Sequence, residues 1–157
     1  HNFYTLTIAG NNRNGKGHVK MNFKDENLDS DMVNTIQLDT VASKVRTVLN
    51  IKGVNFQTLG LAKEDVRARF KLEADIKGNS TDDLQIKGTV TDGLSVRNNR
   101  PYLLGDILFY GKLTDKTTTF DIASNPFDAS LVSNTSVTNL IDELQIQFDN
   151  YLSLIHI

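Results

Sequence analysis

One segment, DVRARFKLEADIKGN from Asp65 to Asn79, restricts most strongly what this chain can fold into. From Asp65 to Lys77 its residues alternate without exception between charged and apolar. The apolar set is Val66, Ala68, Phe70, Leu72, Ala74 and Ile76, and the charged set is Arg67, Arg69, Lys71, Glu73, Asp75 and Lys77. Side chains of a β-strand point alternately to its two sides. The eleven residues from Val66 to Ile76 therefore predict a strand about 36 Å long, with an apolar side that must be covered and a charged side in water.

The same alternation recurs along the chain, separated by segments rich in Asn, Gly and Asp. Strands are predicted near residues 4–8, 19–23, 33–40, 44–52, 84–88, 94–96, 102–113, 118–123 and 127–131. Turns are predicted at NNRNGKG, GNSTDD, TDG and RNNRP, and a loop at DENLDSD. GVNFQTLGLAKED predicts a turn or helical knuckle with Phe56 and Leu59 tucked inward. Because the links are short, the prediction is an all-β antiparallel meander of about nine or ten strands.

One segment near the C-terminus changes period. In SVTNLIDELQIQFDNYL the residues Leu140, Leu144, Phe148 and Tyr151 fall on one side of a helix. Ser136 or Thr138 could cap its start. The sequence therefore predicts one late amphipathic helix. The apolar side of the strands could be covered by a second sheet, as in a sandwich, or by the sheet's own strands and a ligand, as in a barrel or trough.

Composition restricts the classes of site and binding partner that this chain can have. The chain has 157 residues, 39% of them apolar, a net charge of −2 and no cysteine. This predicts a single folded domain and excludes disulfides, thiolate metal sites and a cysteine nucleophile. The weakly acidic balance gives no support for nucleic-acid binding. No apolar run approaches the ~20 residues that span a bilayer.

Residues that carry catalysis are sparse. The histidines are His1, His18 and His156, and they suggest no catalytic triad or metal cluster. Carboxylates gather in predicted loops, at Asp25, Glu26, Asp29 and Asp31 and again at Asp82 and Asp83. They are interpreted as solvated turn residues. No catalytic residue, no metal site and no cofactor is predicted, and the chain is not expected to be an enzyme.

The two ends suggest a fragment. The chain starts at His1 without a Met or a signal peptide, and it ends in LSLIHI, which resembles translated sequencing-adapter sequence. The expected organisation is a single β-rich domain over residues 1–151, part of a longer repeat protein. Residues 152–157 are expected to be a non-native tail.

The order of several phrases resembles a known family. The pair NFQTLGL and ADIKGNSTDDLQIKGTVTDGLSV is followed by RPYLLGDILFYGKLTDKTTTFDIASNPFDASL and then by the predicted helix, which ends in aromatic residues. This order over residues 33–151 resembles the repeating body of the TamB/AsmA-like translocation and assembly module family, in its Bacteroidota form. The resemblance lies in phrase order and not in an invariant motif.

The resemblance implies a function. Members are long periplasmic proteins, anchored in the inner membrane by an N-terminal helix, that support outer-membrane biogenesis and protein secretion. Their repeats form a β-taco, an open trough thought to carry phospholipid acyl chains, and some partner an outer-membrane barrel of the Omp85 type. Both the anchor and the barrel-binding region are expected outside this segment. The implied lipid-binding residues are Val66, Ala68, Phe70, Leu72, Ala74, Ile76, Leu84 and Ile86.

Two other interpretations stay open. The first is a self-contained β-sandwich or barrel that acts as a binding module at the cell surface, with closed edges and a filled core. The second is an enzyme on a β scaffold, such as a glycan hydrolase, which needs a pair of carboxylates aimed into a cleft. Paired acids occur in this sequence only in predicted turns, so the second interpretation is the weaker of the two.

Overall fold

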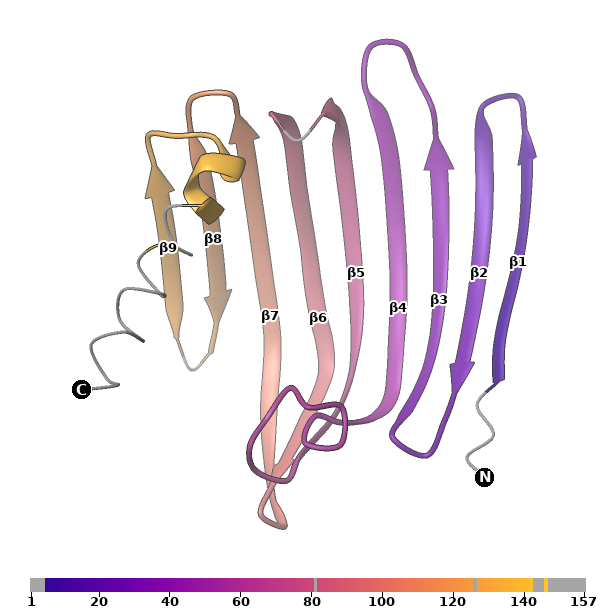
Figure 1. Cartoon of the computed structure of the whole chain (residues 1–157), viewed down its shortest axis with the longest axis vertical. Helices are drawn as coiled ribbons and strands as arrows, with labels where there is room; N and C mark the ends of the chain where they lie inside the picture. Colours follow the sequence, from indigo (N-terminus) through magenta and orange to yellow (C-terminus); the bar gives the residue numbers. More distant parts are fainter. Residues whose placement is uncertain (1–4, 81, 126, 143–145, 147–157) are drawn as a thin grey trace.

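The chain folds as one open antiparallel sheet. The computed structural model describes residues 5–80, 82–125, 127–142 and 146. The strands are β1 (Thr5–Arg13), β2 (Lys16–Lys24), β3 (Leu28–Gln37), β4 (Ser43–Asn55), β5 (Val66–Ser80), β6 (Asp83–Arg97), β7 (Arg100–Thr114), β8 (Thr118–Ser124) and β9 (Asp128–Ser133). Each pairs with the next in sequence order, so that β1 and β9 lie at opposite edges (Figure 1). The predicted all-β meander is confirmed.

Two tight turns explain how the meander forms. Asn14 and Gly15 join β1 to β2 with φ of 53° and 72°, and Asn98 and Asn99 join β6 to β7 with φ of 49° and 62°. Two-residue turns with positive φ match the right-handed twist of the strands they join. Asn and Gly tolerate this conformation better than other residues. The turns predicted at NNRNGKG and RNNRP are therefore confirmed.

The strand register gives the sheet two different sides. Residues directly opposite each other on neighbouring strands share a side, and Ile76 of β5 lies opposite both Val45 of β4 and Ile86 of β6. We call the side that carries Val66 to Ile76 the apolar face. Lys71, Glu73 and Asp75 project from the other side, which we call the charged face.

Within the described residues, no second layer seals the apolar face. Among the described residues the buried apolar side chains are Ile51, Val54 and Ala74, and no large side chain is fully buried. The sheet is an open trough, and neither the second sheet of a sandwich nor the closure of a barrel is found in the described part of the chain.

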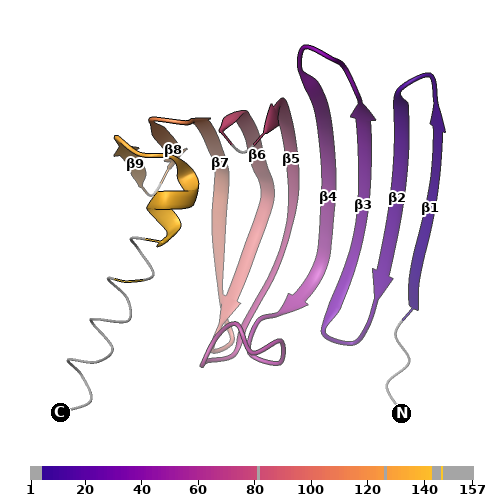
Figure 2. The ribbon, with the colours of Figure 1, turned by 45° about the horizontal axis from the view of Figure 1, so that its top comes forward.

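Two short segments cover parts of the apolar face. The helix that contains residues 137–142 begins beside β8 (Figures 1 and 2), where Thr118 is 4% exposed and donates a hydrogen bond to the carbonyl of Thr135. Ser136 caps this helix, because its Oγ accepts a hydrogen bond from the amide of Asn139. Residues 56–65, the β4–β5 loop, cross in front of β6 and β7 at the opposite end of the strands in Figure 1. Leu144, Phe148, Tyr151 and the tail 152–157 lie outside the described residues.

Three local predictions were wrong. DENLDSD is not a loop throughout, since β3 already begins at Leu28 and its aspartates pair with Lys52. TDG is not a turn, since β6 continues through Asp92 and Gly93 as a bulge, with Asp92 at φ 55°. Leu59 does not point inward, because it is 43% exposed. In each case pairing with neighbouring strands or loop packing overrode the local composition.

Candidate functional site

All eight residues predicted to face lipid lie on the apolar face. The set on β5 keeps one side over the whole strand, and Leu84 and Ile86 of β6 join it because they lie opposite Gly78 and Ile76. Ala74 is buried at 9% exposure, and the other seven are half-buried by their neighbours. The structure therefore brings the predicted residues together as one continuous surface.

The apolar face is much wider than the predicted set. Leu72 lies opposite Leu49 of β4, which in turn lies opposite Met32 of β3. The face also includes Val19, Met21, Phe23, Met32, Ile36, Val45, Leu49, Ile51, Val90, Ile107, Phe109, Leu113, Phe120 and Ile122. Alternation in each strand was a signal for these residues. What was missing was the register that places them on the same side as β5.

Two aromatic rings lie over glycines on this face. The rings of Phe109 and Phe120 stack with centroids 6.4 Å apart. A Cβ built on Gly88 would lie 2.4 Å from Cζ of Phe109, and one built on Gly111 would lie 3.1 Å from the Phe120 ring. Because glycine has no side chain, there is room for the Phe109 ring beside Gly88 of β6 and for the Phe120 ring beside Gly111 of β7.

One polar pair interrupts the apolar face. Thr47 of β4 lies opposite Asn34 of β3, and its hydroxyl donates a 2.8 Å hydrogen bond to Oδ1 of Asn34. Because the two groups satisfy each other, the pair costs little on this face.

Ion pairs run across the opposite face. Arg46 of β4 contacts Glu73 at 2.8 Å and Asp75 at 3.7 Å, and Lys71 contacts Glu73 at 2.7 Å. The pKa of Glu73 is lowered first by Lys71 and then by Arg46. These side chains are 35–55% exposed, so they favour solvation of this face more than they add stability.

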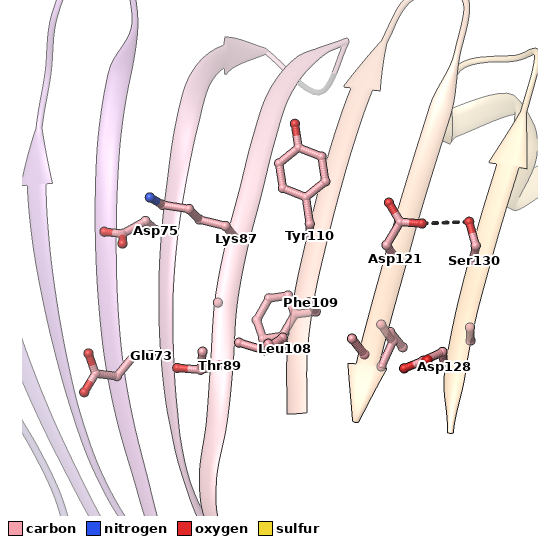
Figure 3. A pocket seen from close by; sticks show the side chains of 14 residues that line it. Glu73, Asp75, Lys87, Thr89, Leu108, Phe109, Tyr110, Asp121, Asp128 and Ser130 are labelled. Carbon is pink, nitrogen blue, oxygen red and sulfur yellow. Dashed lines mark hydrogen bonds between the residues drawn. The ribbon is translucent and has the colours of Figure 1, made fainter. Parts of the chain in front are cut away.

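A shallow hollow of about 660 Å³ lies on the charged face between β5 and β9. Figure 3 shows Lys87, Tyr110, Asp121 and Ser130 along it, and Ser130 donates a 2.7 Å hydrogen bond to Asp121. Two of its apolar residues are well exposed, Leu108 at 55% and Tyr110 at 42%. Leu103, farther along β7, is 86% exposed because the bulges at Asp92 and Gly105 turn it to this face.

The β4–β5 loop is fixed to the end of β6. Arg97 donates a 2.7 Å hydrogen bond from Nε to Glu64, and the amide of Asn98 donates to the carbonyl of Asp65. Arg97 lowers the pKa of the Glu64 carboxyl. Phe56 and Ala62 are half-buried, so the loop covers one end of the apolar face.

No family model, no curated protein and no solved structure matches the chain.

Within the described ranges, no three His, Asp or Glu side chains group where they could hold a metal ion. Of the helical residues that the structure describes, none belongs to a helix long and apolar enough to cross a membrane.

Proposed function

We propose that this chain is a periplasmic segment of a lipid-bridging protein of TamB/AsmA type, in which the apolar face holds phospholipid acyl chains. The observation that carries the proposal is a nine-stranded sheet with one continuous apolar face and no second layer over it in the described chain. Water against such a face is unfavourable. Acyl chains lying there would contribute about 0.8 kcal/mol for each buried CH₂ group.

The charged face supports the same proposal. Its ion pairs, and the lysines that form no ion pair among the described residues, keep the outer side of the trough in water while hydrocarbon fills the inner side. The role is that of a carrier and not of an enzyme. In the full-length protein we place an inner-membrane anchor and a region that meets an outer-membrane barrel outside this segment, as the resemblance implies.

The test is co-purification of lipid. The chain is expressed in a Gram-negative periplasm, purified and analysed by lipid mass spectrometry, together with the double variant Ala68→Asp and Leu72→Asp. The matched control is Gln37→Asp with Gln85→Asp. These two positions lie on the charged face, each opposite a lysine on both neighbouring strands, so the control adds the same charge where it is tolerated.

We expect phospholipid with the wild type and the control, and none with the apolar-face variant. Circular dichroism must show strand content in all three samples. A folded wild type that carries no lipid would contradict the proposal.

A second candidate is a protein-binding module. It is favoured by the exposed apolar residues Leu103, Leu108 and Tyr110 on the charged face, since exposed apolar side chains grouped on one strand are typical of interaction surfaces. If this candidate holds, Leu103→Ser with Leu108→Ser removes partner binding while any bound lipid stays.

A further inference from the structure

Two arginines face each other where β6 turns into β7. Arg97 and Arg100 are directly opposite across the Asn98–Asn99 turn. Arg97 also lies opposite Val66, the first residue of the apolar side of β5, so both arginines continue the apolar face to its rim. Like charges directly opposite each other are destabilising. Such a pair is favoured where an anion sits between the two guanidinium groups.

The surroundings provide room and donors for an anion. Arg97, Asn98, Arg100 and Tyr102 line a hollow of about 380 Å³. Glu64 neutralises Arg97 at 2.7 Å, whereas no ion pair to Arg100 occurs among the described residues. Guanidinium, amide and phenol groups are donors that recognise phosphate oxygens. With one uncompensated positive charge, the hollow suits a phosphodiester with a single negative charge better than a dianion.

We propose that this rim hollow binds the phosphodiester of a phospholipid whose acyl chains lie on the apolar face, which rests on the function proposed above. One acyl chain spans about 15 Å, half of a bilayer's hydrocarbon core, so it fits within the roughly 36 Å over which the apolar side of β5 extends from Val66 to Ile76. The β4–β5 loop lies beside the hollow, since its Glu64 accepts a hydrogen bond from Arg97.

The experiment measures the affinity of every protein by isothermal titration calorimetry. In the proteins that keep Arg100, ¹⁵N NMR of arginine Nε–H groups also follows its side chain. Three probes are titrated into the whole chain: glycerophosphoglycerol, dihexanoyl phosphatidylglycerol and the uncharged dihexanoylglycerol. The variants are Arg100→Gln and Arg100→Lys. The matched control is Arg13→Gln, which also removes one of two cations facing each other beside a hairpin turn, Arg13 and Lys16, but on the charged face.

Arg100→Gln should weaken binding of dihexanoyl phosphatidylglycerol about tenfold, the size expected when hydrogen bonds to a charged group are lost. Arg100→Lys should restore part of that loss, since lysine keeps the charge without the planar fork. Arg13→Gln should bind like the wild type, and dihexanoylglycerol should bind equally to all four proteins.

The outcomes separate the rim site from the lipid-carrier function. If glycerophosphoglycerol shifts the Nε–H resonance of Arg100 but dihexanoylglycerol does not bind, the phosphodiester site is supported and the lipid-carrier function is contradicted. If dihexanoylglycerol binds, and Arg100→Gln has the same affinity as Arg13→Gln for both phosphate probes, the lipid-carrier function is supported and the rim site is overturned.

Discussion

Gly88 shows how a single residue fixes the packing of the apolar face. A Cβ at this position would lie 2.4 Å from both the Phe109 ring and the carbonyl oxygen of Glu73. The φ of Gly88 is not positive, so the need for glycine comes from close approach of the neighbouring strands and not from backbone conformation.

Gly88→Ala should therefore destabilise the chain by roughly 1–3 kcal/mol, the usual cost of forcing extra atoms into an occupied space. Gly53→Ala is the control, because a Cβ there meets nothing within 4 Å. It should leave stability unchanged or raise it by up to about 1 kcal/mol through the unfolded state. The measurement is urea unfolding followed by circular dichroism. Equal midpoints for both variants would show that neither the Phe109 ring nor the Glu73 carbonyl oxygen occupies the space beside Gly88.

At the scale of the elements, β3 and β4 are joined by charge as well as by backbone hydrogen bonds. Lys52 of β4 contacts Asp31 at 2.5 Å and Asp29 at 3.6 Å, and Asn22 of β2 also donates to Asp31. The pKa of Asp31 is lowered from 3.8, first by Lys52 and then by Asn22. The pKa of Lys52 is raised above 10.5, mainly by Asp31.

The sign of the pH dependence follows from these two directions. Because the pKa of Asp31 is lower in the folded state, its contribution to stability is present above about pH 3.8 and is lost as the pH falls through the folded value. Because the pKa of Lys52 is higher in the folded state, its contribution is present below about pH 10.5 and is lost as the pH rises through the folded value.

Lys52→Gln should therefore raise the pKa of Asp31 towards its ordinary value, measured by NMR titration of the carboxyl carbon. It should also flatten the loss of stability below pH 3.8. Lys44→Gln is the control, since it removes a lysine from the same strand and the same face and Lys44 forms no ion pair among the described residues. If the pKa of Asp31 is the same in Lys52→Gln as in the wild type, the lowering of this pKa comes from Asn22 and not from Lys52.

The elements were predictable to different degrees. The long strand β5 was predictable because its alternation is unbroken, and the two Asn-containing turns because few residues accept positive φ. The bulge at Asp92 and Gly93 was not. Asp-Gly is typical of a hairpin turn, and only pairing with β5 and β7 on both sides carries the strand through it.

At the scale of the whole molecule, the sheet has two edges with no strand beyond them in the described chain. On β1, Leu6 is 55% exposed and Ile8 59% exposed, and the strand contains neither proline nor a bulge. Proline, bulges and lysines are the usual features that keep an edge from pairing with another chain. Edge β1 is therefore open to pairing with a further strand.

The isolated chain should self-associate through β1, and Ile8→Lys should shift it towards monomer in sedimentation velocity. The control is Leu108→Lys, the same kind of change at 55% exposure on the inner strand β7. If only Leu108→Lys abolishes self-association, the chains contact each other through the charged face and not through edge strand β1.

The sequence by itself determined the local geometry, because the direction of a strand's side chains depends only on the parity of residues such as Val66 to Ile76. It therefore predicted most of the strands and the two sides of β5, whereas Leu84 and Ile86 join the apolar side of β5 only through the register. The tertiary structure decided the register, and with it the join between Leu72, Leu49 and Met32. It also decided that the sheet stays open, and it brought Arg97, Arg100 and Glu64 together. The register, the open sheet and this grouping of side chains depend on which strands pair and on where bulges fall. Contacts between residues far apart in the chain produce no periodic pattern in the sequence, so they could not be predicted from it.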